Sequence, residues 1–549
     1  MIQKKLEEII LQTWLEISDE KIEFQLEEPP KNINADFAVN ICFLASKVLK
    51  RAPRQIAEEF IEKLTENKLG ENIYENVFIA GPGFLNFTLK KNLYVEELKQ
   101  IYTQDTKYGH SAKGQGEKVL VEFVSANPTG PLHIGHGRGA VIGDCVARIL
   151  KAAGYYVECE YYVNDFGNQI SILGRSVEAR LKQLKGEEVQ IPEDFYKGEY
   201  VIDIAKELLA TGKDTFGIGY VESFAMQYIM ETIKKDLADF GVIFDTWFHE
   251  SQLYNSEGEK SSLDFVLDKL EEKKALVERD GALWIDMKDR HDDDKDRVIV
   301  RADKRPTYFA SDIAYHDKKY KRGFTKLINV WGADHHGYIP RLKAAVSCLG
   351  YDEKSLEIIL YQLVSLYREG TKIAMSTRGG QFVPLKEVVD EVGRDAARFF
   401  LIMRGSDNAI DFDLDLAKKH SSENPVYYVQ YAHARISSLF RAAESTGKYS
   451  FEKILGKLDD FYGDEEVKVI KELVKFPEVI NRCADQLSPH YITLYLQELA
   501  AVFHAYYTRV RVLDDDIQKA SSRLILCKCI AVTIKNGLNL LGINAPSKM

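Results

Sequence analysis

The chain is 549 residues long, 45% of its residues are hydrophobic, and 73 basic against 84 acidic side chains give it a formal net charge of −11. This length and composition exclude a disordered chain and predict three or four domains with packed cores. The net negative charge argues against indiscriminate coating of nucleic acid, although local basic patches would be enough for specific RNA contact.

Cysteine use and hydropathy indicate the compartment. The seven cysteines are an odd number and form no Cys-x-x-Cys pair, which argues against a disulfide framework and against a four-cysteine zinc site. The amino terminus mixes lysines with glutamates, and no run of 18 apolar residues occurs in the chain. We therefore expect a cytoplasmic protein without membrane contact and without a metal site.

Residues 1–116 alternate helical patterns with a β-like run, which predicts an α+β domain. Phe84 and Asn86 lie near its end, in the sequence Gly-Pro-Gly-Phe-Leu-Asn-Phe. On residue chemistry alone, packing in the core is the simplest expectation for Phe84. The turn-forming residues of 107–114 predict a linker into the next domain.

The most informative segment is residues 127–136, Asn-Pro-Thr-Gly-Pro-Leu-His-Ile-Gly-His. A β-rich run, 119–124, precedes it, a helical pattern follows it, and a second β-rich segment, 155–163, completes a β-α-β unit. Ligands of such units lie beyond the carboxyl ends of the strands. His133 and His136 therefore fall at a helix entrance, where free N–H groups and the helix dipole favour phosphate. The sequence predicts a nucleotide site here.

Residues 172–296 form a charged, mostly helical insertion that ends in a hairpin-like run. We find no chemistry in its helices, and we expect structural or acceptor-stem support at most. After it, Tyr308 and Asp312 stand four residues apart in a segment expected to be helical from Thr307, so they share one face. A phenol and a carboxylate side by side could hold a guanidinium group.

The last third of the chain is expected to be helical. A helical tract covers 385–424, and helical periodicity dominates from residue 425 to residue 549. Nothing in this region demands catalysis. On residue chemistry alone, Tyr506 could be an ordinary helix-core residue.

The loop at 127–136 resembles the His-Ile-Gly-His signature of class I aminoacyl-tRNA synthetases. Its neighbours narrow the resemblance to arginyl-tRNA synthetases: residues 125–132 before it, Gly143-Asp144 after it, and Asn-Asp-Phe-Gly-Asn-Gln at 164–169. The resemblance then runs almost to both termini. It implies an α/β fold with a class I Rossmann-type, doubly wound, parallel-sheet catalytic core, an N-terminal α+β domain and an all-helical C-terminal domain.

The resemblance also implies a division of labour along the chain. The expected parts are a tRNA-elbow-binding domain at 1–116, a catalytic domain at 117–384 with the insertion at 172–296, a linking helical segment at 385–424, and an anticodon-binding domain at 425–549. The implied activity is that of an arginine–tRNA ligase working as a monomer. Arginine attacks the α-phosphorus of Mg-ATP, and tRNA(Arg) then accepts the arginyl group, so that ATP with Mg²⁺ is a substrate and no tightly bound cofactor is needed.

The second class I signature is usually Lys-Met-Ser-Lys-Ser. Here it reads Ala-Met-Ser-Thr-Arg at 374–378, and both usual lysines are absent. Their loss removes electrostatic help to the leaving pyrophosphate, an effect often worth roughly a few kcal/mol. Arg378 and Lys372 are the nearest candidates for the missing cation, and the sequence leaves open which one acts.

The resemblance assigns roles to single residues. Catalysis is expected of His133, His136, Met375, Ser376 and Arg378. ATP is expected to contact Pro128, Thr129, Gly130, His133, Gly135, His136, Asp334 and His335. Arginine is expected to contact Glu122, Ser125, Asn127, His136, Tyr308, Asp312 and His335. Contact with tRNA is expected at Phe84, Asn86, Tyr506 and Met549.

Two points about these residues stay open. Glu122 lies in the middle of a strand, where a buried carboxylate needs a partner, which the ligand or an inter-strand charge could provide. The sequence does not decide which carboxylate holds the guanidinium group and which holds the α-amino group. Asp334 and His335 belong to an acidic and histidine-rich cluster, for which we favour ligand contact over zinc.

Two rival functions remain. A ligase of the same superfamily with another small substrate, such as a pantothenate-synthetase-like enzyme, could share the nucleotide loop, but it would not need the helical tail or the RNA-like N-terminal domain. A non-catalytic RNA-binding relative is favoured by the lysine-poor second signature. His133, His136, Asn127, Tyr308 and Asp312 weigh against it.

Overall fold

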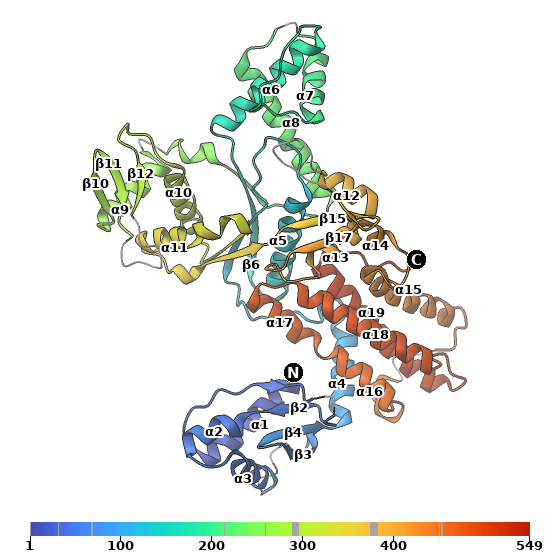
Figure 1. Cartoon of the computed structure of the whole chain (residues 1–549). Helices are drawn as coiled ribbons and strands as arrows, with labels where there is room; N and C mark the ends of the chain where they lie inside the picture. The colour runs from blue at the N-terminus through green and yellow to red at the C-terminus, as the bar shows by residue number, and fades with distance from the viewer. Residues whose placement is uncertain are drawn as a thin grey trace. The chain divides into compact units, whose positions relative to one another are not determined.

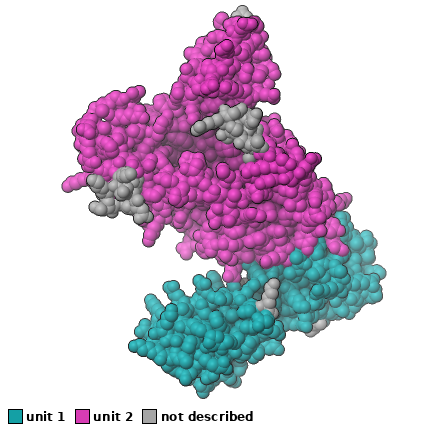
Figure 2. All heavy atoms as spheres, viewed as in Figure 1, with its two compact units in different colours: residues 1–108, 436–475, 501–533 teal, residues 109–435, 476–500, 534–549 magenta. Residues whose placement is uncertain are grey.

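The computed structural model describes residues 2–549 apart from 31, 67, 69, 214, 258–259, 288–295, 374–382, 450 and 452–453. Its internal contacts divide the chain into two compact units (Figure 2). The first unit joins residues 1–108 with 436–475 and 501–533, and the second joins 109–435 with 476–500 and 534–549. None of the helices in the described ranges is long and apolar enough to cross a membrane.

A five-stranded parallel sheet lies at the centre of the second unit (Figure 1). Its strands, in order across the sheet, are β14 (Leu356–Tyr361), β13 (Lys326–Gly332), β5 (Lys118–Phe123), β6 (Tyr156–Val163) and β7 (Thr246–His249). The chain moves outward from β5 first on one side and then on the other, which is doubly wound topology. The predicted α/β class and the β-α-β unit around the 127–136 loop are thus confirmed.

Helix α5 (Ile134–Ala152) connects β5 to β6 and is buried along nearly its whole length. Glycine allows this close packing. A Cβ atom added at Gly143 would lie 2.2 Å from the Phe123 ring, and one added at Gly137 would lie 2.5 Å from Leu385. The helix that begins at the nucleotide loop therefore rests directly on the sheet, and its first turn has little freedom to shift.

The connection from β6 to β13 contains two groups of elements. Three helices gather in one group, as Figure 1 shows: α6 (Asn168–Leu184), α7 (Glu199–Ala210) and α8 (Ile218–Asp239). Strand β7 then adds to the central sheet. The second group is a small sheet with helices: α9 (Ser262–Glu272), β10 (Leu276–Arg279), β11 (Ala282–Ile285), β12 (Arg297–Val300) and α10 (Tyr308–Lys321). Helix α11 (Ile339–Cys348), which follows β13, packs in the same core. The expected hairpin is β10 and β11.

A second, smaller sheet follows the central one. It consists of β16 (Thr371–Lys372), β15 (Val364–Arg368) and β17 (Ile410–Asp413), and its helices are α12 (Leu385–Val392), α13 (Arg394–Ile402) and α14 (Leu414–Lys418). The second signature lies between β16 and α12. Met375, Ser376 and Arg378 therefore fall outside the described residues.

Arg398 of α13 connects its own helix to parts of three others. The side chain is fully buried and forms an ion pair with Asp144 of α5. It also donates to Leu541 O at 2.8 Å and to Phe240 O at 3.1 Å, at the ends of two further helices. A buried guanidinium needs such a full set of acceptors. We call Arg398 and Asp144 the α13–α5 pair.

The first unit contains an antiparallel sheet of β1 (Leu26–Glu27), β2 (Phe37–Val39), β4 (Phe84–Leu89) and β3 (Tyr74–Ala80). Its helices in the amino-terminal segment are α1 (Ile2–Ile17), α2 (Ile41–Leu49), α3 (Pro53–Glu66) and α4 (Lys91–Gln104). The carboxyl-terminal third contributes α15 (Pro425–Glu444), α16 (Asp464–Leu473), α17 (Phe476–Gln486), α18 (His490–Arg509) and α19 (Ile517–Leu540) to the two units. The expected α+β start and helical end are confirmed.

Candidate active site

The nucleotide loop places two histidines at the start of α5. His133 is the N-cap, and its Nδ1 accepts from the backbone N–H of His136 at 3.3 Å. The Nδ1 of His136 accepts from the backbone N–H of His133, also at 3.3 Å, and the two rings stack with centroids 3.7 Å apart. Because both Nδ1 atoms accept, each neutral ring carries its proton on Nε2. The pair presents donors at the positive end of a helix dipole.

Both rings are neutral at pH 7. Burial lowers the pKa of His133 below its usual value. Burial, with a smaller contribution from the neighbouring His133, lowers the pKa of His136 to about 3. Neutral rings with Nε2–H groups can act on a phosphate as hydrogen-bond donors, without full positive charges.

The loop between β5 and α5 is strained and firmly held. Val124 and Ser125 have φ angles of 67° and 41°, a left-handed conformation that side chains other than glycine rarely adopt. Such strain persists where the surroundings fix the backbone, often at functional sites. Here the Tyr161 hydroxyl donates to Ala126 O at 2.9 Å, and the Tyr200 hydroxyl of α7 donates to Thr129 O at 2.8 Å.

The chain that returns from residues 374–382 pairs with the nucleotide loop. Leu385 N donates to Leu132 O at 2.7 Å, and Pro384 forms an isolated β-bridge with His133. Residues 384 and 385, where α12 begins, therefore lie beside the residues that enter the first turn of α5.

Asp312 is the centre of a carboxylate cluster. It accepts a hydrogen bond from the hydroxyl of Tyr338. Burial of the carboxyl group raises the pKa of Asp312 to about 7, and the nearby Glu122 and Glu250 add to the rise. The hydrogen bond from Tyr338 and the charge of Lys319 oppose it. Three acidic side chains from different elements therefore converge here, and we name Glu122, Glu250 and Asp312 the carboxylate cluster.

Glu250 was missed by the sequence reasoning. It follows β7 directly, it is 2% exposed, and burial raises its pKa. The Asn164 amide, oriented so that its nitrogen faces both acceptors, donates to Glu250 Oε2 at 2.9 Å and to Phe166 O at 2.8 Å. The expected insertion thus contains a strand of the central sheet with a polar end. The only signal was a four-residue strand followed by a glutamate, which is too short to separate from the helical surroundings.

Glu122 has a partner inside the protein. Lys319 Nζ of α10 lies 2.6 Å from Glu122 Oε2, and both side chains are buried. The other oxygen, Oε1, accepts from Ser125 Oγ at 2.9 Å, and this hydroxyl accepts from Tyr162 N at 3.1 Å. Glu122 therefore does not depend on the ligand for a counter-charge. It links the buried end of the cluster to the nucleotide loop.

The remaining expected ligand residues lie at the same edge of the sheet and are more exposed. Tyr308 begins α10 one turn before Asp312 and is 68% exposed. Asp334 and His335 follow β13 and are exposed, with 3.8 Å between their charged groups. Asn127 lies 3.2 Å from the Asn164 amide that contacts Glu250. The structure thus brings Ser125, Asn127 and Asp312 together through shared partners, and it leaves Tyr308, Asp334 and His335 open.

The residues expected to contact tRNA occupy different environments. The Phe84 ring is partly buried against Phe43, with 4.7 Å between centroids, and Asn86 is fully buried and donates to Phe84 O. Tyr506 is 2% exposed and donates to Glu466 Oε1, so both of its ring faces are covered as the helix-core interpretation predicts. Met549 is 52% exposed.

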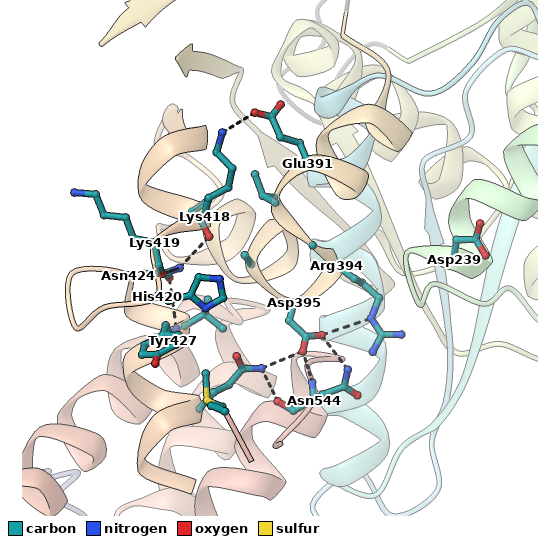
Figure 3. A pocket seen from close by; sticks show the side chains of 17 residues that line it. Asp239, Glu391, Arg394, Asp395, Lys418, Lys419, His420, Asn424, Tyr427 and Asn544 are labelled. Atoms are coloured by element: carbon teal, nitrogen blue, oxygen red, sulfur yellow. Dashed lines mark hydrogen bonds and ion pairs between the residues drawn. The ribbon is translucent and has the colours of Figure 1, made fainter. Parts of the chain in front are cut away.

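Met549 lines a pocket of about 840 Å³ in the second unit (Figure 3). Its charged lining residues are of both signs: Arg394, Lys418 and Lys419 are basic, and Asp239, Glu391 and Asp395 are acidic. Asp395 accepts from Gln430 at 3.0 Å, and Gln430 also donates to Asn544 O at 2.9 Å, which holds the final residues against α13 and α15. The pocket combines polar groups, the Tyr427 ring and an exposed thioether, a suitable lining for an unstacked base.

The doubly wound parallel sheet, the paired histidines at the helix entrance and the helical carboxyl-terminal part define a class I aminoacyl-tRNA synthetase. Three family descriptions match consecutive parts of the chain: "Arginyl tRNA synthetase N terminal domain" at residues 1–89, "tRNA synthetases class I (R), catalytic domain" at 97–413 and "DALR anticodon binding domain" at 429–549. The chain belongs to the arginyl-tRNA synthetase family, and it is a ligase.

Similar proteins cover nearly the whole chain. It is 48% identical over 533 residues to an arginine–tRNA ligase of Citrifermentans bemidjiense, covering 95% of this chain and 94% of that protein. It is 43% identical over 560 residues to one of Anoxybacillus flavithermus, covering 100% and 98%. The structure of Thermus thermophilus arginyl-tRNA synthetase has the same fold, with a TM-score of 0.79 at 24% identity and 100% of both chains covered.

Proposed function

We propose that the chain activates arginine with Mg-ATP and transfers the arginyl group to the 3′ end of tRNA(Arg), as a cytoplasmic monomer without a tightly bound cofactor. The observation that carries the proposal is the carboxylate cluster. Three carboxylates converge beside a strained nucleotide loop at the carboxyl edge of the sheet. A buried acidic site of this kind suits a cationic amino acid with a planar, multidentate head group.

ATP occupies the nucleotide loop in this proposal. The Nε2–H groups of His133 and His136 donate to the phosphate oxygens, and the first turn of α5 adds its backbone donors and dipole. Further contacts come from Pro128, Thr129, Gly130, Gly135, Asp334 and His335. Charge builds on the phosphorus during the reaction, so that fixed donors stabilise the transition state more than the bound substrate. Met375, Ser376 and Arg378 complete the site from the second signature.

Arginine lies with its carboxylate toward the nucleotide loop, because that carboxylate attacks the α-phosphorus. Ser125 and Asn127 of the loop hold the α-amino end. The guanidinium end then points to Asp312 and Glu250, with Tyr308 and Tyr338 flanking it. Both carboxylates have another hydrogen-bond partner that fixes their direction, which supports a bidentate geometry.

Of the residues expected to contact tRNA, Met549 is the one best placed. It lines the pocket of Figure 3, and the last residues are held there by Gln430. Phe84 and Asn86 belong to β4, an inner strand of the sheet in the N-terminal domain, and we propose this domain as the site of tRNA-elbow contact. The four-part division of the chain at 116, 384 and 424 is part of the proposal.

An aminoacylation assay with arginine, citrulline and lysine tests the proposal. Citrulline has the shape of arginine without its charge, and lysine has the charge without the planar fork. We expect arginine to be charged and each analogue to be disfavoured by at least about 1,000-fold in kcat/KM, because each leaves buried carboxylates without donors. Failure to charge tRNA(Arg) with arginine, or equal use of citrulline, would refute it. The same assay separates this function from both rivals.

A further inference from the structure

Lys319 occupies an unusual position beneath the carboxylate cluster. It is fully buried, its Nζ lies 2.6 Å from Glu122 Oε2 and 3.2 Å from Asn329 Oδ1, and it sits 4.1 Å from the centroid of the Tyr315 ring. A buried ammonium group is costly and persists only where acceptors compensate for lost water. The expected site residues did not include Lys319, and the reaction proposed above does not use it.

A chain of hydrogen bonds connects Lys319 to Asp312. Lys319 donates to the Asn329 amide oxygen, and Asn329 Nδ2 lies 2.9 Å from His316 Nε2. His316 Nδ1 lies 2.8 Å from the backbone oxygen of Asp312. Since the amide nitrogen can only donate, His316 accepts at Nε2 and donates from Nδ1. Burial lowers the pKa of His316 well below its usual value, in agreement with this neutral ring. The bonds therefore run in one direction, from Lys319 to the turn of α10 that carries Asp312.

Charged and titratable groups face Asp312 from several elements. They are Glu122 of β5, Tyr162 of β6, Glu250 after β7, Lys319 of α10 itself and Tyr338 before α11. Two of them are carboxylates that raise the pKa of Asp312, and Lys319 is a cation that lowers it. Because Asp312 titrates near pH 7, small changes in this balance decide whether it is ionised under ordinary conditions.

We propose that Lys319 is a positioning residue for arginine capture, which holds Glu122 in place and keeps Asp312 in the ionised form that receives a cationic side chain. The inference rests on the proposed function, because it assigns Asp312 to the substrate. Lys319 touches neither substrate nor reacting atoms. It acts through the ion pair with Glu122 and through the hydrogen-bond chain to Asp312.

The chain supplies a matched control for this proposal. Arg322 lies one turn after Lys319 and forms an ion pair with another buried carboxylate, Glu160, on the neighbouring strand β6. The groups that act most strongly on Asp312 do not include Arg322, which is more exposed than Lys319 and also pairs with Glu158. Lys319→Met and Arg322→Met thus each remove a cation from a buried carboxylate, and only the first removes a cation from the cluster.

The experiment measures kcat and KM for arginine between pH 6 and 9 for the full chain, Lys319→Met, Lys319→Arg and Arg322→Met. For Lys319→Met we expect the pH at which KM falls to move upward by about one unit, so that KM at pH 7 rises about fivefold, because the ionised fraction of Asp312 drops from about one half to about one tenth. At pH 9 its KM should approach that of the unaltered chain. Lys319→Arg should restore the pH profile, and Arg322→Met should leave the profile in place even where the melting temperature drops.

A second variant keeps the proposal testable where Lys319→Met does not fold. Glu122→Gln is nearly isosteric and leaves the ammonium without its counter-charge, so the pH at which KM falls should move downward. Identical pH profiles for the unaltered chain and Glu122→Gln, or equal profiles for Lys319→Met and Arg322→Met, would overturn the inference. Failure of the unaltered chain to charge arginine would instead overturn the proposed function, so the two failures are distinguishable.

Discussion

Two buried pairs of a cation and a carboxylate stand in the second unit, and they differ in what surrounds them. In the α13–α5 pair, Arg398 meets Asp144 and two backbone oxygens, so that its donors are occupied by the protein. Lys319 and Glu122 instead lie beside two further carboxylates, Glu250 and Asp312. Around the first pair, Arg148 also pairs with Asp144, so that no carboxylate lacks a cation and the pair joins helices, whereas the second pair leaves an excess of negative charge. An excess of negative charge around a buried pair indicates a binding site for a cationic ligand. A pair whose groups are all occupied within the protein indicates a structural contact between helices.

The sharpest way to test the contrast is Asp312→Asn. The amide keeps the shape of the side chain and removes the charge that receives arginine, so kcat/KM for arginine should fall on the order of 1,000-fold. The melting temperature should stay the same or rise, because a carboxylate held in a cluster of like charge is lost. Aminoacylation kinetics would measure the loss of activity, and thermal unfolding would measure the stability. A large loss of stability would contradict the assignment of Asp312 to ligand binding.

Arg398→Met should do the opposite. Removing Arg398 leaves the buried Asp144 with the partly exposed Arg148 as its remaining cation and leaves two buried backbone oxygens without their donor. We expect the free energy of unfolding to fall by about 3 kcal/mol. Activity per folded molecule should change less than in Asp312→Asn. Denaturant unfolding gives the first quantity, and active-site titration of the soluble fraction gives the second. A variant as stable as the unaltered chain would show that the pair does not stabilise the contact between the helices.

The pH dependence of arginine binding should show the imbalance without any substitution. Asp312 has a pKa raised to about 7, so it is protonated at pH 6 and ionised at pH 8. Since the ionised form binds the cation, KM for arginine should fall as pH rises through 7, by about tenfold between pH 6 and 8. KM for ATP, measured in parallel, serves as the control. A flat profile for arginine would mean that Asp312 does not meet the substrate.

Tyr308→Phe should have the smallest effect. Tyr308 is 68% exposed, and a hydrogen bond at an open edge contributes about 1 kcal/mol, which corresponds to roughly fivefold in KM for arginine. kcat at saturating arginine should hardly change. Steady-state kinetics would measure it, with Tyr162→Phe in the buried part of the cluster as the comparison. A loss of kcat/KM as large as that of Asp312→Asn would contradict the expectation that the exposed Tyr308 contributes less to arginine binding than the buried cluster.

Local sequence patterns predicted much of the fold and part of the candidate site. The spacing of apolar residues predicted the strand, loop and helix around His133 and His136. Tyr308 and Asp312 both lie on α10, and their four-residue spacing places them on one face of it. What the sequence could not reach depends on distant partners. Glu122 and Lys319 are 197 positions apart, and β7 places Glu250 with only four residues. Likewise, nothing local shows that the ring of Tyr506 is enclosed or that residues 436–475 cluster with 1–108.

The reciprocal cap formed by His133 and His136 has a consequence for how variants of this site combine. Each imidazole accepts a hydrogen bond from the backbone N–H of the other histidine. Replacing one histidine therefore removes the acceptor for the other residue's N–H and leaves the remaining ring less firmly oriented. The two positions therefore behave as a single unit, and their individual losses are not additive. A homologue that keeps only one of the two histidines is therefore expected to lose more than half of the stabilisation that the pair provides.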